Sequence, residues 1–150
     1  TVRPEALHQL ELAHIPFSGS RSKSWDEFAR EDAPKMDFVF TVCDNATNEV
    51  CPIWPGQPMT AHWGVADPAA VSGDAKEIAR AYRDAFTTLD RRISLFLSLP
   101  LSSIDKLKIQ KEINDIGRKS NQLCKRDLSR VHWNHVGCNN TLLLASTAEC

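Results

Sequence analysis

The chain has 150 residues, of which 42% are hydrophobic and 25% are charged, and its formal net charge at neutral pH is -1. This length and composition are typical of one globular domain. The nearly balanced charge argues against nucleic acid or a membrane surface as a partner, and no apolar run reaches the length of a transmembrane helix.

The five cysteines are odd in number and widely spaced, which does not fit the disulfide framework of a small secreted protein. The chain also starts without the apolar core of a signal peptide. We therefore expect a cytoplasmic protein with reduced thiols, in which any functional disulfide is transient.

Two short helices are predicted in the N-terminal part. Residues 4–14 have Pro4 at a first helical position and an apolar face behind it. Residues 25–30 follow Ser24, an N-cap residue, and Glu27 at the spacing of a capping box. The residues expected to pack from these helices are Ala6, Leu7, Leu10, Trp25 and Phe28.

Residues 38–42 are rich in β-branched and aromatic side chains and predict a buried strand of an α/β sheet. Cys43 stands at the carboxyl end of this strand, which is the edge where open α/β sheets bind ligands. Cys51 follows after a segment of turn-forming residues. Two thiols thus flank a short connection, although two buried structural thiols are the plainer alternative.

A second strand is predicted over residues 59–65, and it leads into the turn Asp67-Pro68. Helices are expected over residues 74–97, ending before Pro100, and over residues 103–116. The second helix is expected to start at Ser102 or Ser103 and to close at Gly117. The first carries one broad apolar stripe made of Ile78, Ala81, Tyr82, Ala85, Phe86, Leu89, Ile93, Phe96 and Leu97.

Several polar side chains allow a functional and a structural interpretation. Arg21 and Lys23 could contact an anion, but a solvated loop is favoured. His62 is interpreted as a hydrogen-bonded core residue rather than a ligand or an acid-base group, and Trp54 and Trp63 as core or pocket-wall residues. A zinc set is conceivable in the C-terminal part, but its spacing fits no common finger; it would consist of Cys124, His132, His135 and Cys138.

Five segments together resemble bacterial arsenate reductases built on the low-molecular-weight protein tyrosine phosphatase fold. They are Ser20-Arg-Ser-Lys-Ser-Trp-Asp-Glu-Phe-Ala29, Val42-Cys-Asp-Asn-Ala46 with Cys51-Pro-Ile-Trp-Pro-Gly-Gln-Pro58, Ala61-His-Trp-Gly-Val-Ala-Asp-Pro-Ala69, and Arg92-Ile-Ser-Leu-Phe-Leu-Ser-Leu-Pro100. The resemblance covers roughly residues 3–118. It implies a phosphatase-like domain over residues 1–118 and a divergent tail over residues 119–150.

The resemblance also implies roles for three residues. In such enzymes a loop cysteine attacks arsenate, a second cysteine attacks the cysteine–arsenic adduct, and a third carries the disulfide outward for reduction. Cys43 and Cys51 match the second and third cysteines, and Asp67 matches the general acid. A turn or N-cap role is the plainer interpretation of Asp67. No bound cofactor is implied, and the expected reductant is thioredoxin, or glutaredoxin with glutathione.

The nucleophilic loop of that family, a cysteine followed six positions later by arginine, has no convincing match in these residues. Cys124 and Arg130 have the spacing, but the residues between them contain no glycine and predict helix instead of a phosphate cradle. We therefore expect the chain to be inactive alone. The alternative is a non-catalytic, oligomeric binding or interaction domain descended from the same family.

The expected fold is α/β: an incomplete low-molecular-weight phosphatase-like, or flavodoxin-like, parallel sheet flanked by helices. The family's first strand would lie beside residues 38–42, and its loss would leave buried backbone groups unpaired. Residues 120–130 could be helical, and residues 141–145 are the one remaining run with strand character. The sheet is therefore expected to be completed by the C-terminal tail or by a second chain, in a homodimer or higher oligomer.

Overall fold

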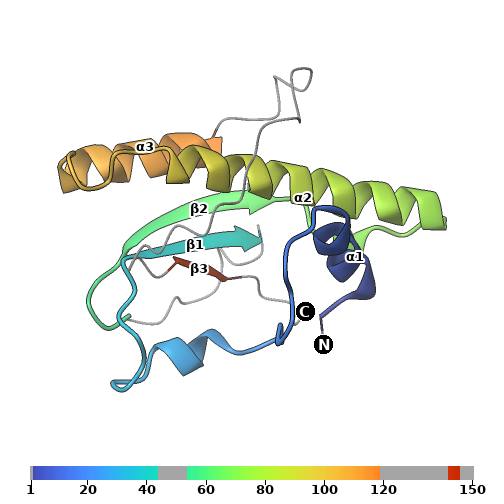
Figure 1. Cartoon of the computed structure of the whole chain (residues 1–150), viewed down its shortest axis with the longest axis horizontal. Helices are drawn as coiled ribbons and strands as arrows, with labels where there is room; N and C mark the ends of the chain where they lie inside the picture. Colours follow the sequence, from blue (N-terminus) through green and yellow to red (C-terminus); the bar gives the residue numbers. More distant parts are fainter. Residues whose placement is uncertain (1, 44–53, 119–141, 146–150) are drawn as a thin grey trace.

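The computed structural model describes residues 2–43, 54–118 and 142–145. Its elements are the helices α1 (Pro4–Leu12), α2 (Ala75–Leu97) and α3 (Lys106–Arg118), the short 3-10 helices η1 (Trp25–Phe28) and η3 (Pro68–Ala70), and the strands β1 (Phe38–Cys43), β2 (Met59–Val65) and β3 (Leu142–Ala145). The fold is α/β, with α2 and α3 lying along the sheet (Figure 1). Within the described residues, no helix is both long enough and apolar enough to cross a membrane.

The sheet has the order β2-β1-β3, and β1 is parallel to both of its neighbours. Sequence reasoning left open whether the tail or a second chain would pair with β1. In the structure β3 pairs with it, Phe38 lying opposite Leu142 and Thr41 opposite Ala145. The strand expected near residues 141–145 is thus present, and it gives the buried β1 a partner on each side.

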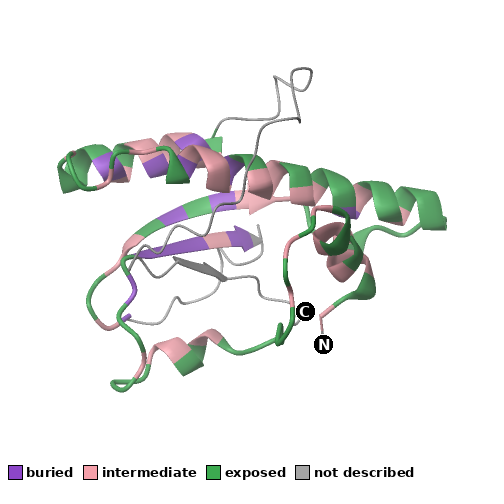
Figure 2. Ribbon diagram, viewed as in Figure 1, coloured by how far each residue is buried: buried purple, intermediate pink, exposed green. Residues whose placement is uncertain are grey.

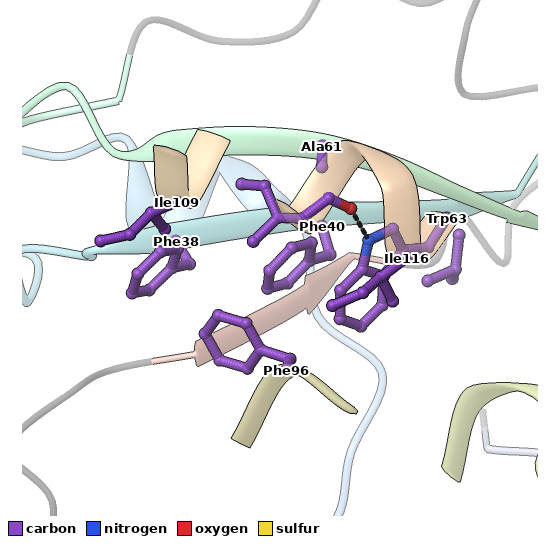
Figure 3. Close-up of a cluster of buried hydrophobic side chains, with 9 residues drawn as sticks. Phe38, Phe40, Ala61, Trp63, Phe96, Ile109 and Ile116 are labelled. Atoms are coloured by element: carbon purple, nitrogen blue, oxygen red, sulfur yellow. Dashed lines mark hydrogen bonds between the residues drawn. The ribbon is translucent and has the colours of Figure 1, made fainter. Parts of the chain in front are cut away.

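One face of the sheet carries the main core, which α2 and α3 cover (Figure 3). Phe40 and Trp63 stack with ring centroids 3.9 Å apart, and Phe96 of α2 meets Phe40 edge-on at 5.2 Å. The indole Nε1 of Trp63 donates a hydrogen bond to the carbonyl of Ile113 at 2.9 Å, which fixes α3 against β2. Burial of such large aromatic side chains dominates core energetics. The cluster consists of Phe38, Phe40, Val42, Ala61, Trp63, Phe96, Ile109, Ile113 and Ile116.

A smaller core lies on the other face, where Val39 points because side chains alternate along a strand. Met36, Val39 and Trp54 are buried there, and Trp25 and Phe28 of η1 pack against them. The predicted packing roles of Trp25, Phe28, Trp54 and Trp63 are therefore confirmed. Figure 2 shows the buried residues concentrated on β1, β2 and the inner side of α3, whereas the N-terminal part of α2 is largely exposed.

Two predictions about helix starts are wrong: the capping box at Glu27 and the start of the last helix at Ser102 or Ser103. The Ser24 hydroxyl does cap η1 by accepting from Asp26, but Glu27 completes no capping box because its carboxylate pairs with Arg21. Helix α3 starts at Lys106, where the Asp105 carboxylate accepts from the Lys108 amide at 2.9 Å.

Gly117 does not close α3 but lies inside it. A Cβ atom at this position would come 2.5 Å from the His62 carbonyl oxygen and 2.8 Å from Cδ1 of Trp63. Gly117 is thus needed for the close approach of α3 to β2, since any side chain would push the two apart. Leu97 is likewise outside the stripe assigned to it, because its side chain is 61% exposed.

Candidate active site

The candidate site is the edge of the sheet where the parallel strands β1 and β2 end. Cys43 is the last residue of β1, and its backbone lies opposite Val65, the last residue of β2. Asp67 follows Val65 by two residues. The structure therefore brings Cys43 and Asp67 to one edge, as expected for the carboxyl ends of parallel strands.

The register of the two strands changes just before this edge. Thr41 lies opposite His62 and Cys43 opposite Val65, so two steps along β1 match three along β2. The extra residue forms a β-bulge in β2. Bulges redirect the strand that carries them and often occur beside active sites.

Arg92 of α2 holds this bulge in place. One guanidinium nitrogen donates to the carbonyls of Trp63 at 2.6 Å and Gly64 at 3.0 Å, and the other donates to the carbonyl of Gly117 at 3.1 Å. Arg92 is only 7% exposed, and the Gly117 carbonyl belongs to the C-terminal turn of α3, the negative end of that helix dipole. The buried cation thus ties α2, β2 and α3 together at the site.

Sequence reasoning did not single out Arg92, although a signal was present. Arg92 is spaced three residues after Leu89 and four before Phe96, so a charged residue stands within the apolar stripe of α2. A buried charge requires partners. The pattern could have predicted a structural arginine, but not which carbonyls it would bind.

Asp67 is the N-cap of η3. Its carboxylate accepts a hydrogen bond from the Ala69 amide at 2.9 Å, and Pro68 occupies the first helical position. The side chain is exposed to solvent. The plainer interpretation, an N-cap aspartate, is therefore confirmed, and the general-acid role stays a prediction.

An open cleft of about 440 Å³ lies beside Asp67, between η3 and α2. The small residues Ala81 and Ala85 of α2 leave this space, and Asp84 adds a second carboxylate to its wall. The cleft is lined by Gly64, Val65, Ala66, Asp67, Pro68, Val71, Ala81, Asp84, Ala85, Thr88 and Arg92. Its carboxylates disfavour an oxyanion, and its arginine donates to backbone carbonyls.

Tyr82 connects this region to α1, which lies beyond the carboxyl ends of the strands and packs against α2 (Figure 1). Burial raises the pKa of the Tyr82 hydroxyl, and the carboxylates of Glu5 and Asp67 raise this pKa further, whereas Arg3 lowers it. Tyr82 therefore keeps its proton at neutral pH. Oε2 of Glu5 is buried without a hydrogen-bond partner among the described residues.

The other candidate residues do not join this site. Nδ1 of His62 lies 2.8 Å from the Thr41 hydroxyl, but His62 is exposed, so its assignment to the core is wrong. It lines a separate cleft of about 370 Å³ with Gly64, Asn114, Gly117 and Arg118. Arg21 forms a bidentate ion pair with Glu27, and the Lys23 ammonium lies 5.6 Å from the ring centroid of Phe28.

Cys51 and the conceivable zinc set of Cys124, His132, His135 and Cys138 lie outside the described residues. Within residues 2–43, 54–118 and 142–145, no three His, Cys, Asp or Glu side chains are grouped as metal ligands. No protein-family model matches the chain, and no curated protein matches it. The likeness to arsenate reductases therefore depends on the five sequence segments quoted above.

Proposed function

We propose that the chain is an arsenate reductase-related domain of the low-molecular-weight phosphatase-like family, with Cys43 and Cys51 as its redox pair and Asp67 as its acid. One observation carries the proposal. Cys43 and Asp67 are delivered to the same edge of the sheet by adjacent parallel strands. This is the edge at which α/β proteins gather the residues of their sites.

In the proposed reaction, a loop thiol from outside these residues first forms a sulfur–arsenic bond with arsenate, and Asp67 protonates the oxygen that leaves. The Cys43 thiolate then attacks the loop sulfur, so that an S–S bond forms as the S–As bond breaks. The electron pair of the S–As bond stays on arsenic, which leaves as arsenite. Cys51 next attacks Cys43 and releases the loop thiolate, and thioredoxin or glutaredoxin supplies the two electrons that reduce the Cys43–Cys51 disulfide.

The same proposal holds that the chain does not reduce arsenate by itself. Catalysis of this kind needs backbone N–H groups and an arginine around the tetrahedral oxyanion. Arg92, the arginine beside Asp67, donates instead to three carbonyls, and the cleft there carries two carboxylates. The same observation favours the second candidate, a non-catalytic interaction domain that has kept the fold of the family.

A thiol-exchange assay separates the two candidates. In a variant with Cys124, Cys138 and Cys150 replaced by serine, we expect a limiting amount of a chromogenic aromatic disulfide to release two thiols per molecule of reagent. Cys43 is modified first, and Cys51 then displaces the second thiol and closes the disulfide. The product should be unlabelled and lighter by two hydrogens in an intact mass spectrum.

The matched control is Cys51→Ser in the same background, which should release one thiol and keep the label on Cys43. A label that persists although Cys51 is present would favour the non-catalytic domain. In the unsubstituted chain, preferential pairing of Cys51 with Cys124, Cys138 or Cys150 would contradict the proposed pair. Steady-state reduction of arsenate by the chain alone, abolished in Cys43→Ser, would contradict the requirement for an outside loop thiol.

A further inference from the structure

The two edges of the three-stranded sheet differ. Side chains from the helices cover the outer edge of β2: Nε2 of Gln110 donates to the Thr60 carbonyl at 2.8 Å, and Arg92 donates to the Gly64 carbonyl at 3.0 Å. Gly117 also brings α3 within contact of the His62 carbonyl. These contacts block another strand from pairing with β2, in the way that natural sheets protect an edge.

The outer edge of β3 has no such cover among the described residues. β3 pairs with β1 on one side only, and no described residue outside β1 forms a hydrogen bond with its backbone. Its sequence, Leu-Leu-Leu-Ala, also contains no charge, proline or glycine that would oppose pairing with another strand. Among the described residues, the sheet is therefore covered at the β2 edge and uncovered at the β3 edge.

The backbone register shows which groups face this outer edge. The Met59 amide donates to the Asp37 carbonyl at 2.9 Å, so the N–H and C=O groups of Asp37 point toward β2. The N–H and C=O groups of successive residues in a strand point to alternate sides. Those of Phe38 and Phe40 therefore point toward β3.

In a parallel ladder, a residue bonds to the two neighbours of the residue opposite to it. Phe40 lies opposite Leu144, so it forms hydrogen bonds with Leu143 and Ala145, whose N–H and C=O groups face β1. By the same alternation, the N–H and C=O groups of Leu142 and Leu144 face outward. This outer edge carries donors and acceptors in a pattern that can pair with its own copy.

We propose that the outer edge of β3 pairs with β3 of a second copy of this chain, antiparallel and about a twofold axis. Leu142 then lies opposite Leu144 of the partner subunit, and each such pair exchanges two N–H···O=C bonds. The two sheets merge into one, and a closed dimer results because the interface is the same on both copies. The formal charge of -1 on each copy opposes this association only weakly. The dimer is independent of the proposed thiol chemistry.

The test is light scattering on the full chain, kept in a thiol-free reductant so that no disulfide dimer forms. The mass should rise with concentration from 16.8 kDa toward twice that value. Leu144→Pro removes an N–H that faces outward and leaves the ladder to β1 intact, so it should abolish the dimer and keep the circular dichroism spectrum of the parent chain.

Two matched variants accompany it. Leu144→Thr keeps the N–H and should still dimerise, whereas Leu143→Pro removes an N–H that faces β1 and should destabilise the monomer as well. A parent chain that stays monomeric at every concentration would overturn the proposal. So would a dimer that survives Leu144→Pro, or one that is lost equally in Leu144→Thr, since the backbone edge would then not be the contact.

If Leu144→Pro does not fold, amide exchange in the parent chain gives the answer. The amides of Leu142 and Leu144 should gain protection as the concentration rises. The amides of Leu143 and Ala145 should be protected at all concentrations, because they already face β1. Concentration-independent exchange at Leu142 and Leu144 would rule out the β3–β3 contact. A dimer in which a segment other than β3 pairs with this edge would also rule it out.

Discussion

Replacement of Arg92 by methionine should destabilise the chain strongly, because its guanidinium is bonded at three points to the backbone. The three hydrogen bonds have lengths of 2.6, 3.0 and 3.1 Å, and Arg92 is 7% exposed. Each bond from a charged donor contributes about 1.5–3 kcal/mol. Desolvation of the buried cation offsets part of this gain, so we expect a net loss of about 3 kcal/mol.

Urea denaturation followed by tryptophan fluorescence measures this loss, since Trp63 is fully buried and its carbonyl accepts a hydrogen bond from Arg92. Arg91→Met is the matched control: Arg91 is the neighbouring arginine of α2, and it is exposed. Its effect should stay within about 0.5 kcal/mol. Equal effects of the two substitutions, or a loss below about 1 kcal/mol in Arg92→Met, would show that these bonds do not hold the bulge.

Three further predictions follow from the same geometry. Gly117→Ala should destabilise by about 1–3 kcal/mol despite the better helix propensity of alanine, because its Cβ meets the His62 carbonyl; Lys111→Ala on the exposed side of α3 is the control, and thermal unfolding is the measurement. Asp67→Ala should lose about 0.5–1 kcal/mol with the η3 cap, whereas Asp67→Asn keeps the acceptor and should stay near the parent value in urea, so that its effect on chemistry can be measured separately. Tyr82 is the one tyrosine of the sequence, so absorbance near 295 nm should report its ionisation alone, with a pKa above the usual value. Because the folded-state pKa is raised, this hydroxyl contributes stability below about pH 10 that is lost as the pH rises through the folded-state pKa. A Tyr82→Phe variant whose stability declines equally at alkaline pH would contradict this prediction.

Sequence reasoning predicted the elements whose signal is local. The strand at residues 59–65 has the predicted bounds, and the helix at residues 74–97 differs from α2 by one residue. Both depend on apolar periodicity, which can be read from the local sequence. The start of α3 was missed because several residues before it can cap a helix, and only Asp105 is positioned to accept from the helix amides.

The errors at Gly117 and Glu27 have a common physical cause, which is a contact that the local sequence pattern does not contain. Glycine near the end of a helix usually marks a C-cap, yet Gly117 is required by the β2 backbone that lies against it. Likewise, Glu27 has the spacing of a capping box but pairs with Arg21. A local pattern gives the preferences of a residue, and tertiary contacts decide which preference is realised.

The position of the candidate site and the protection of the β2 edge depend on the same side chain. Arg92 occupies the carbonyls at the outer edge of β2, and through them it holds the bulge that sets the register of Cys43 against Val65. A variant that frees this edge therefore also shifts the strand that leads to Asp67. Since β3 lies on the far side of β1, an interaction at its outer edge leaves these contacts unchanged. For this reason we expect Leu144→Pro to change the mass of the assembly without changing thiol exchange at Cys43, and Arg92→Met to change thiol exchange at Cys43.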